Sequence, residues 1–420
     1  FIKNIKDIVC YLYLLTNWYE YYICLNDDEI DIIPLINNNL LENKMNPEFH
    51  RSHLFIVGNK NIHAKLCADN YLEFVDNSSG ILCDINFNNS INMEKNVVNK
   101  PRWVWDDHTI GDAIYVGEKF RIFILENFEH NWNILPYFTN SDYLFIIIGS
   151  FMGKWNFENC AEVMSERNPN FNKKNIIFMV NEPMQMFFAV EYGFDFVMCN
   201  HNAIICDETI FNISNENKIY DHVINCRPEK NFKKPYLVKG IENLAVIKGR
   251  NYDKNDFYNM ELLCPKFMNK DRIEKNDVAK ILNKSRSAGI YSTKEGACFS
   301  SSEYLLCGVP VVSTDALGGR QIWYTKSNSV ICDPSELNVR DAILYILNNQ
   351  HIFDPQKIRN EHIRFAKSQR INLMKKIEQI FILQKAEYTF NTEICVETNI
   401  FKNIRKWRDI NDFINIFFKK

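Results

Sequence analysis

The sequence predicts an α/β protein with two doubly wound, Rossmann-like units. Its apolar residues gather in short continuous runs, such as Tyr143–Gly149 (YLFIIIG), and do not alternate with polar ones. Continuous runs are typical of parallel strands that are buried on both faces. The runs come in two successive series with room for a helix between neighbours, and a chain of 420 residues exceeds the usual size of one domain.

The composition narrows the classes of function. Hydrophobic residues make up 46% of the chain, which is enough for packed cores and argues against disorder. The net charge of -3, from 49 basic and 52 acidic residues, leaves no electrostatic footprint for nucleic acid as the main partner. The 13 cysteines include no Cys-x-x-Cys pair and no Cys/His cluster, so we expect reduced thiols and a cytoplasmic location.

The first hundred residues carry the weakest pattern. His53–Gly58 (HLFIVG) and Tyr71–Val75 (YLEFV) have the composition of strands. A polar, Asn-rich stretch then runs to Pro101, where we place the first domain boundary. The sequence leaves the role of residues 1–100 open, and an extension of the next domain is one alternative.

Residues 101–217 are predicted to form the first Rossmann-like domain. Four apolar runs supply its strands: Phe120–Leu125, Tyr143–Gly149, Asn175–Val180 and Phe194–Cys199. The Gly149–Gly153 loop (GSFMG) and His201 each follow a strand, so both are expected at the carboxyl edge of the sheet. There a neutral imidazole suits proton transfer near pH 7, although an ordinary loop histidine is the alternative.

Residues 218–350 are predicted to form the second Rossmann-like domain. Its strands are His222–Cys226, Asn243–Lys248, Ala288–Ser292 and Val309–Thr314, and its helices include Lys275–Ser285 and Ser300–Cys307. Residues 351–420 read as polar helices that end in a basic amphipathic stretch, Asn399–Lys420.

The most informative segment is Ala288–Arg320 (AGIYSTKEGACFSSSEYLLCGVPVVSTDALGGR). A strand leads through a Gly-containing loop into a helix, whose first N–H groups suit a phosphate. Glu295 lies in the loop and Glu303 in the helix, with seven residues between them. Gly308 is placed to end the helix, with Pro310 just beyond.

In order, spacing and context this segment resembles the large retaining GT-B glycosyltransferase family (glycosyl transferases group 1, family 4-like), whose signature is Glu-x7-Glu. The resemblance implies two Rossmann-like domains facing across a cleft, with the donor held by the C-terminal one. It also implies that Glu303 binds the ribose hydroxyls of a nucleoside-diphosphate sugar, and that Glu295 contacts the transferred sugar. The amides of Gly296, Ala297, Cys298 and Phe299 would face the sugar and the diphosphate.

A basic loop after the strand His222–Cys226 extends the resemblance. Family members carry an Arg here and a Lys five or six residues later, which fits Arg227 and Lys233, with Lys234 and Lys230 as competitors. The leaving nucleoside diphosphate gains negative charge as the glycosidic bond breaks, and fixed cations stabilise that charge without reorganising. We therefore expect no metal and no cofactor, and no Asp-x-Asp pair sits at a strand end to hold one.

Several features leave alternatives open. Ser300 stands where many members have Pro, and Ser300-x-x-Glu303 also reads as a capping box. The Gly318-Gly319 loop lacks the Glu that often follows it in the family. The resemblance places the last helix back on the N-terminal domain, whereas the basic amphipathic character of Asn399–Lys420 also suits a helix lying on a membrane surface.

The expected activity is therefore transfer of a sugar, with retention, from a nucleotide sugar to a hydroxyl of a glycan, protein or lipid. A GT-B epimerase and a degenerate nucleotide- or glycan-binding module are the alternatives.

Overall fold

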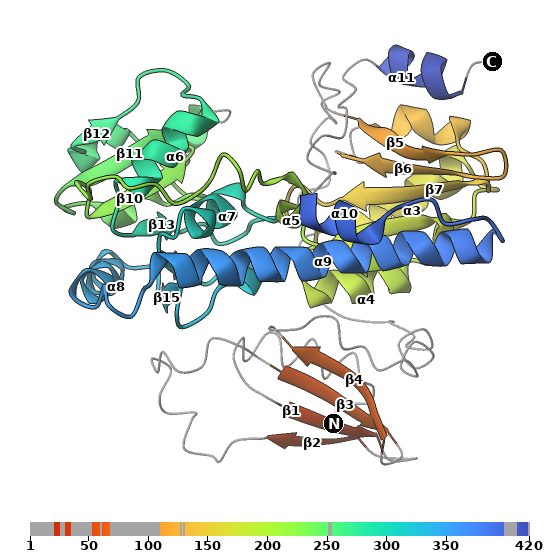
Figure 1. Ribbon diagram of the computed structural model, residues 1–420, viewed down its shortest axis with the longest axis horizontal. Coiled ribbons are helices and arrows are strands. Elements are labelled where there is room, and N and C mark those ends of the chain that lie inside the picture. Colours follow the sequence, from red (N-terminus) through yellow and green to blue (C-terminus); the bar gives the residue numbers. More distant parts are fainter. Residues whose placement is uncertain are drawn as a thin grey trace. The chain divides into compact units, whose positions relative to one another are not determined.

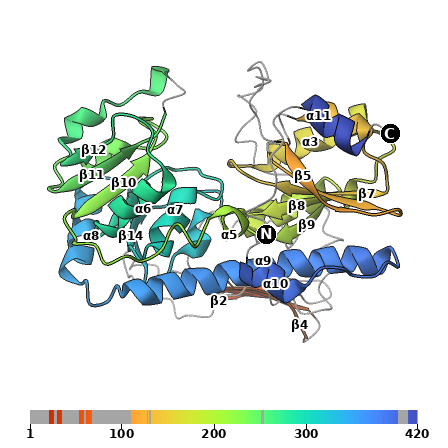
Figure 2. The same cartoon turned by 45° about the horizontal axis from the view of Figure 1, so that its top comes forward.

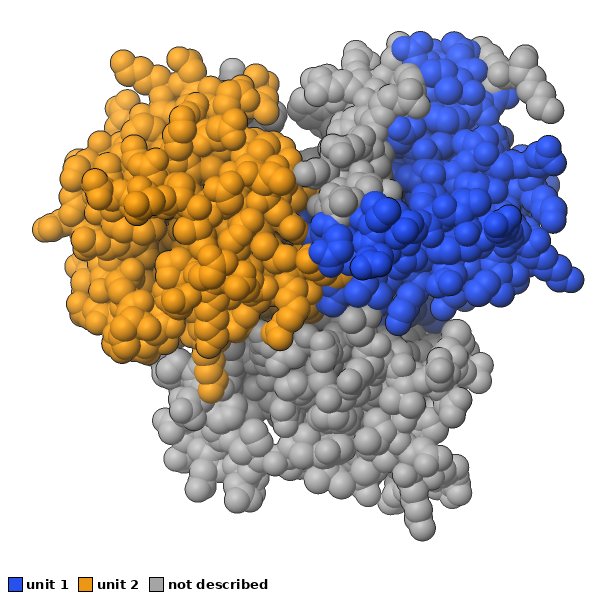
Figure 3. Space-filling view, in the orientation of Figure 1, with its two compact units in different colours: residues 1–35, 52–204, 368–420 blue, residues 36–51, 205–367 orange. Residues whose placement is uncertain are grey.

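The computed structural model describes residues 110–126, 128, 131–250, 254–398 and 410–418, together with the backbone of four strands nearer the N-terminus. The chain divides into two compact units (Figure 3). Unit 1 comprises Phe1–Leu35, Ser52–Ile204 and Ser368–Lys420, and unit 2 comprises Ile36–Arg51 and Ile205–Lys367. Residues 205–217, predicted to end the first domain, thus group with unit 2, and the last residues group with unit 1.

Unit 1 contains a sheet of order β5-β6-β7-β8-β9 (Figure 1). Its strands are β5 (Gly111–Val116), β6 (Arg121–Leu125), β7 (Asp142–Ile147), β8 (Ile176–Val180) and β9 (Asp195–Met198). Strands β6 to β9 are parallel, with α3 (Lys154–Arg167) and α4 (Pro183–Glu191) between them in the chain. Every residue of β7 and β8 is buried, which explains their continuous apolar sequence.

Strand β5 is antiparallel to β6, and the sequence did not predict it. Its middle residues are only half-buried, so it lacks the continuous apolar run of a central strand. Gly111 is required at its start, because its φ is +129° and an added Cβ would lie 2.0 Å from the carbonyl oxygen of Ile124.

Unit 2 contains a wholly parallel sheet of order β12-β11-β10-β13-β14-β15 (Figure 1, Figure 2). Its strands are β10 (His222–Cys226), β11 (Leu244–Lys248), β12 (Phe267–Met268), β13 (Ala288–Ile290), β14 (Val311–Thr314) and β15 (Ser329–Cys332). Its α-helices are α6 (Lys275–Asn283), α7 (Phe299–Leu306) and α8 (Glu336–Asn348). Numbered from β10, this is the 3-2-1-4-5-6 strand order of doubly wound folds, so the predicted α/β class is confirmed.

The start of helix α9 (Pro355–Leu383) is anchored within unit 2. Gly308 ends α7 in the left-handed region (φ +68°), as predicted, and a Cβ there would lie 2.7 Å from the carbonyl oxygen of Pro355. Arg359 donates to the carbonyl oxygens of Leu306 at 2.5 Å and Phe211 at 2.6 Å. These contacts fix the end of α7 against the start of α9.

The end of α9 belongs to unit 1, and its aromatic side chains pack against rings of that unit. Phe381 packs on Phe120, with ring centroids 5.0 Å apart, and Gln384 donates to the Tyr143 hydroxyl at 2.6 Å. The short helix α10 (Thr392–Thr398) follows in the chain.

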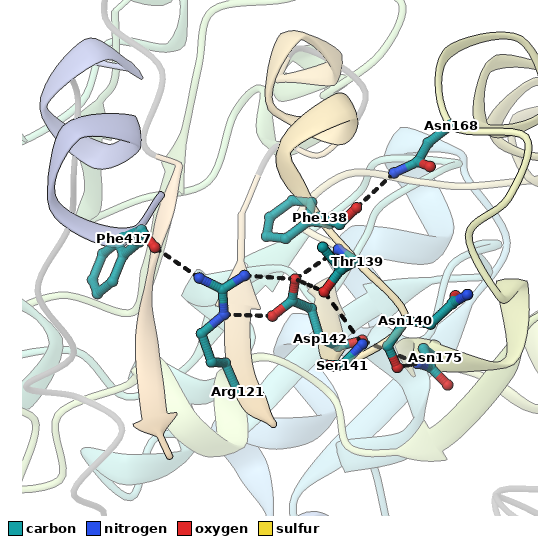
Figure 4. A network of polar contacts seen from close by, with 9 residues as sticks. All are labelled: Arg121, Phe138, Thr139, Asn140, Ser141, Asp142, Asn168, Asn175 and Phe417. Carbon is teal, nitrogen blue, oxygen red and sulfur yellow. Dashed lines mark hydrogen bonds and ion pairs between the residues drawn. The ribbon is translucent and has the colours of Figure 1, made fainter. Parts of the chain in front are cut away.

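Helix α11 (Ile410–Phe417) packs on unit 1 through aromatic rings. The ring centroid of Phe123 in β6 lies 5.6 Å from that of Phe417 and 5.7 Å from that of Phe418, and the Phe413 side chain is fully buried. Arg121 donates to the Phe417 carbonyl oxygen at 2.7 Å and makes two bonds to Asp142, of 2.6 and 2.8 Å (Figure 4). The apolar face that a membrane-surface helix would need is therefore used for packing within the protein.

A separate mixed sheet of order β2-β1-β3-β4 lies nearer the N-terminus in the chain. Its strands are β1 (Tyr21–Leu25), β2 (Ile30–Pro34), β3 (His53–Gly58) and β4 (Asn61–Cys67). The predicted strand His53–Gly58 is confirmed, whereas Tyr71–Val75 lies outside the described residues. Within the described part of the chain, no helix is both long and apolar enough to cross a membrane.

Candidate active site

The candidate site lies where the strand order of unit 2 reverses. Strand β10 pairs with β11 on one side and with β13 on the other, although β13 comes three strands later in the chain. The loops that leave the carboxyl ends of β10 and β13 therefore diverge at this point, and open α/β sheets bind ligands there. These loops carry Arg227, Lys233 and Glu295.

The basic loop after β10, residues 227–234, is held by backbone bonds. The amide of Lys233 donates to the Glu229 carbonyl oxygen at 3.0 Å. Farther along the chain, Asp256 accepts from the amides of Lys230 and Asn231, at 3.0 Å through its carbonyl oxygen and at 2.9 Å through its carboxylate. Four of the eight loop residues are basic and one is acidic, so the loop presents fixed positive charge.

Two of the predicted residues meet directly. Lys233 Nζ forms an ion pair with Glu295 Oε1, and the two side chains are only 15% and 11% exposed. Ser292 donates its hydroxyl to the same carboxylate oxygen at 2.7 Å. The contact identifies Lys233 as the lysine of this loop that faces Glu295, and it joins residues 62 positions apart in the chain.

Arg227 lies on the same loop and pairs with Glu229 at 3.3 Å. Its side chain is 39% exposed, more than that of Lys233. Gly249 allows its close approach, since a Cβ at that glycine would lie 3.1 Å from the Arg227 Cγ. Burial raises the pKa of Glu229, and the positive charges of Arg227 and Lys233 partly offset the rise.

The structure overturns the capping alternative for Glu303. Helix α7 begins at Phe299, and the cap residue is Cys298, whose left-handed backbone (φ +54°) makes no side-chain cap bond. Ser300 is thus inside the helix, where its hydroxyl donates to the Asn225 carbonyl oxygen at 3.1 Å. Glu303 accepts from the Asn225 side-chain amide at 3.1 Å. Burial raises the pKa of Glu303 to about 7, against the opposing effects of Lys275 and of the Asn225 bond.

Helix α7 is locked to the strands beneath it. The Tyr304 hydroxyl accepts from the Asn225 amide at 2.7 Å and lies within 3.5 Å of the Gly289 carbonyl oxygen. Ser301 donates to the Tyr324 hydroxyl at 2.9 Å. The first two turns of α7, which include Glu303, are thereby fixed beside the end of β10.

Gly296, Ala297 and Cys298 form the turn into α7, which begins at Phe299. Gly296 and Ala297 are buried, Cys298 is half-buried, and Phe299 is 44% exposed. Burial raises the pKa of the Cys298 thiol, and of the neighbouring Cys226 thiol, to about 12. Both thiols are thus neutral near pH 7 and are poor nucleophiles.

Arg320 is the residue that sequence reasoning missed. It is 1% exposed, and it donates to the Ser292 hydroxyl and to the Thr314 carbonyl oxygen, both at 2.5 Å. A single Arg after Gly318-Gly319 belongs to no motif. The glycine pair was the available signal, because its positive φ angles of 110° and 93° turn the chain back towards β13.

Solved structures that resemble this chain share few of its residues. A sucrose-phosphate synthase from Thermosynechococcus elongatus is 12% identical, with a TM-score of 0.47, over 62% of this chain and 74% of that one. HepE from Anabaena, in complex with UDP, is 13% identical with a TM-score of 0.42, over 58% and 72% of the two chains. The pneumococcal O-GlcNAc transferase GtfA, in complex with UDP and GlcNAc, is 14% identical with a TM-score of 0.44, over 60% and 55%.

No protein-family model matches the sequence, and no curated protein matches it.

His201 belongs to unit 1, whereas the residues described above belong to unit 2. It is 3% exposed and lies three residues after the end of β9, and its Nδ1 is 3.0 Å from the Ile148 carbonyl oxygen. The Asn181 side chain donates to the same carbonyl oxygen at 2.8 Å and accepts from the His201 amide at 3.3 Å. His201 thus helps to tie together the carboxyl ends of β7, β8 and β9.

Among the described residues, no three His, Cys, Asp or Glu side chains are grouped so as to hold a metal ion. The described cysteines are free thiols. The independence from metal remains a prediction.

Proposed function

We propose that this protein is a glycosyltransferase of the GT-B kind, which moves a sugar from a nucleoside-diphosphate sugar to a hydroxyl acceptor. The observation that carries the proposal is the Lys233–Glu295 contact at the reversal of strand order in unit 2. The sequence resemblance assigns Lys233 to the phosphates and Glu295 to the transferred sugar, and both groups belong to the same donor molecule.

The basic loop is suited to the leaving group. As the bond between the sugar and the phosphate breaks, negative charge develops on the nucleoside diphosphate. Arg227 and Lys233 sit on a loop that backbone bonds already hold in place, so their charges need little reorganisation to stabilise that state. Two fixed cations would fill the role of a metal ion, and the proposed reaction is metal-independent.

The two glutamates are suited to the hydroxyl groups of the donor. Glu303, oriented by Asn225, would accept from the ribose hydroxyls, and Glu295 would accept from the sugar near the reacting carbon. The amides of Gly296–Phe299 would face the sugar and the diphosphate. A hydrogen bond to a charged group contributes on the order of 1.5–3 kcal/mol, so a few such contacts give ordinary micromolar affinity.

The proposed step uses no enzyme nucleophile and retains the anomeric configuration. The acceptor oxygen bonds to the anomeric carbon on the face that the phosphate oxygen leaves, and the departing phosphate oxygen takes the acceptor proton. The acceptor is proposed to be a hydroxyl of a glycan, a protein or a lipid, with His201 assigned to the acceptor side.

Substitution of Arg227 tests the phosphate assignment. Arg227→Ala should weaken binding of UDP, GDP or ADP, whichever the wild type prefers, roughly ten- to hundredfold, because one charge-assisted bond is lost. Binding of the matching nucleoside should change little. Titration calorimetry measures both ligands, and Lys230→Ala is the matched control, since Lys230 is an exposed cation of the same loop.

Three results would contradict the proposal. Equal losses for the nucleoside and its diphosphate would place Arg227 away from the phosphates. A wild type that binds no nucleoside diphosphate would remove the donor site. Incubation with a labelled nucleotide sugar distinguishes the three alternatives. A transferase moves the label to an acceptor, an epimerase inverts the configuration at one carbon of the sugar, and a binding module does neither.

A further inference from the structure

Arg320 carries a buried charge beside the proposed donor site. Its guanidinium is 1% exposed, and its hydrogen bonds go to the Ser292 hydroxyl and the Thr314 carbonyl oxygen. A buried cation is costly unless its surroundings compensate it. Ser292 links Arg320 to the Glu295 carboxylate, because it hydrogen-bonds to both residues.

The hydrogen bonds from Arg320 to Ser292 and from Ser292 to Glu295 form a relay, and the donors and acceptors of these groups fix its direction. A guanidinium has only donors, so the Ser292 oxygen must accept from Arg320. The single hydroxyl hydrogen of Ser292 is then left for Glu295 Oε1, 2.7 Å away. The same carboxylate oxygen also pairs with Lys233 Nζ. Glu295 therefore stands between two cations, one in direct contact and one acting through a hydroxyl.

The backbone holds the two ends of the relay in register. The Glu295 amide donates to the Leu317 carbonyl oxygen at 2.8 Å, and the Leu317 amide donates to the Thr293 carbonyl oxygen at 3.0 Å. Gly319, with φ +93°, then caps the short 3₁₀ helix Arg320–Trp323. Backbone hydrogen bonds thus join the loops after β13 and β14, which carry Ser292 and Arg320.

We propose that Arg320 is a positioning residue, which holds the Glu295 carboxylate in place through Ser292 when the donor draws Lys233 towards its phosphates. The inference rests on the proposed function, in which Lys233 serves the phosphates and Glu295 serves the sugar. With Lys233 shared or released, Glu295 keeps one fixed partner and still points at the sugar hydroxyls. Arg320 therefore supports the affinity for the sugar part of the donor and leaves the affinity for the nucleotide part unchanged.

The test compares two ligands that differ only by the sugar. Calorimetry with UDP and UDP-glucose, or with the guanosine or adenosine pair if the wild type prefers it, gives an affinity ratio for each variant. Ser292→Ala breaks the relay without changing any charge, and Arg320→Gln removes the charge itself. Each should lower the affinity for the nucleotide sugar roughly tenfold, as for one charged hydrogen bond, and should change the affinity for the nucleoside diphosphate less than about twofold. Arg320→Lys should restore part of the ratio.

Arg359→Gln is the matched control, because Arg359 is a half-buried arginine of unit 2 that also donates to backbone carbonyl oxygens. It should lower the melting temperature and leave the ratio unchanged. Equal losses for both ligands in Ser292→Ala, or no loss for either, would overturn the role of Arg320 while the donor site stands. A wild type that binds neither ligand would overturn the proposed function, and the role of Arg320 with it.

Discussion

Glu303 is a carboxyl group under opposing influences. Burial penalises its charged form and raises its pKa to about 7, while Lys275 and the Asn225 amide favour that charged form. In the proposed complex, the ribose hydroxyls would donate hydrogen bonds to the carboxylate and so compensate for the hydration that it loses through burial. The ligand-free protein thus carries an electrostatic cost that a donor relieves.

Because of this cost, the effect of Glu303→Gln on the free energy of unfolding should depend on pH. The folded-state pKa is raised from 4.5 to about 7, so the stability linked to this proton is complete below about pH 4.5 and is lost as the pH rises through 7. Glutamine cannot ionise. The ligand-free variant should therefore be more stable than the wild type at about pH 8, by up to about 3 kcal/mol, and similar to it at about pH 4.5. Thermal unfolding at the two pH values measures the difference.

Donor affinity should change in the opposite sense. The wild type should bind its nucleotide more tightly as the pH rises from about 6 to 8 and Glu303 ionises, and the Gln variant should lack this rise. Glu242→Gln, an exposed carboxyl of the same unit, is the control for a general charge effect. A Gln variant that binds the nucleotide like the wild type at every pH would remove Glu303 from the site.

At the scale of single elements, the last helix shows how an amphipathic sequence finds its partner. Helix α11 places Phe413 and Ile414 inwards, and Arg121 of β6 donates to the Phe417 carbonyl oxygen near its end (Figure 4). The Arg121 guanidinium also lies over the Phe418 ring, 4.7 Å from its centroid. The helix therefore completes the core of unit 1.

Phe413→Ala tests this packing. The side chain is fully buried, so its loss should lower the free energy of unfolding by about 3–5 kcal/mol, measured by urea denaturation. Ile416→Ala on the same helix, where the side chain is 54% exposed, should cost less than about 0.5 kcal/mol. If α11 instead served a membrane surface, Phe413→Ala would weaken co-sedimentation with anionic vesicles and leave stability unchanged.

At the scale of the whole molecule, the source of positive charge at the proposed donor site decides whether the protein needs a divalent metal ion. In the proposed reaction Arg227 and Lys233 neutralise the leaving diphosphate, so no divalent ion is needed. Treatment with EDTA should therefore leave both nucleotide affinity and sugar transfer unchanged, within about twofold. Calorimetry and transfer of a labelled sugar, each with and without the chelator, check this. Activity that EDTA abolishes and added Mg²⁺ restores would contradict the prediction.

The amino-acid sequence by itself determined the fold class of the protein and named the residues of the candidate site. Continuous apolar runs identified β7 and β8 closely, because full burial leaves a local trace in the sequence. The edge strand β5, the two-residue β12 and the partly exposed β15 leave no such trace. Glu295 and Glu303 were found because their spacing and context lie within one short segment.

Only the tertiary structure decided which side chains meet. It placed Lys233 on Glu295, began α7 at Phe299 and so removed the capping box, and brought Arg320 to Ser292. It also directed the apolar face of α11 onto Phe123. The three side-chain contacts join residues far apart in the chain, and the free energy of burying a charge or a ring depends on such tertiary contacts and not on the neighbours in sequence.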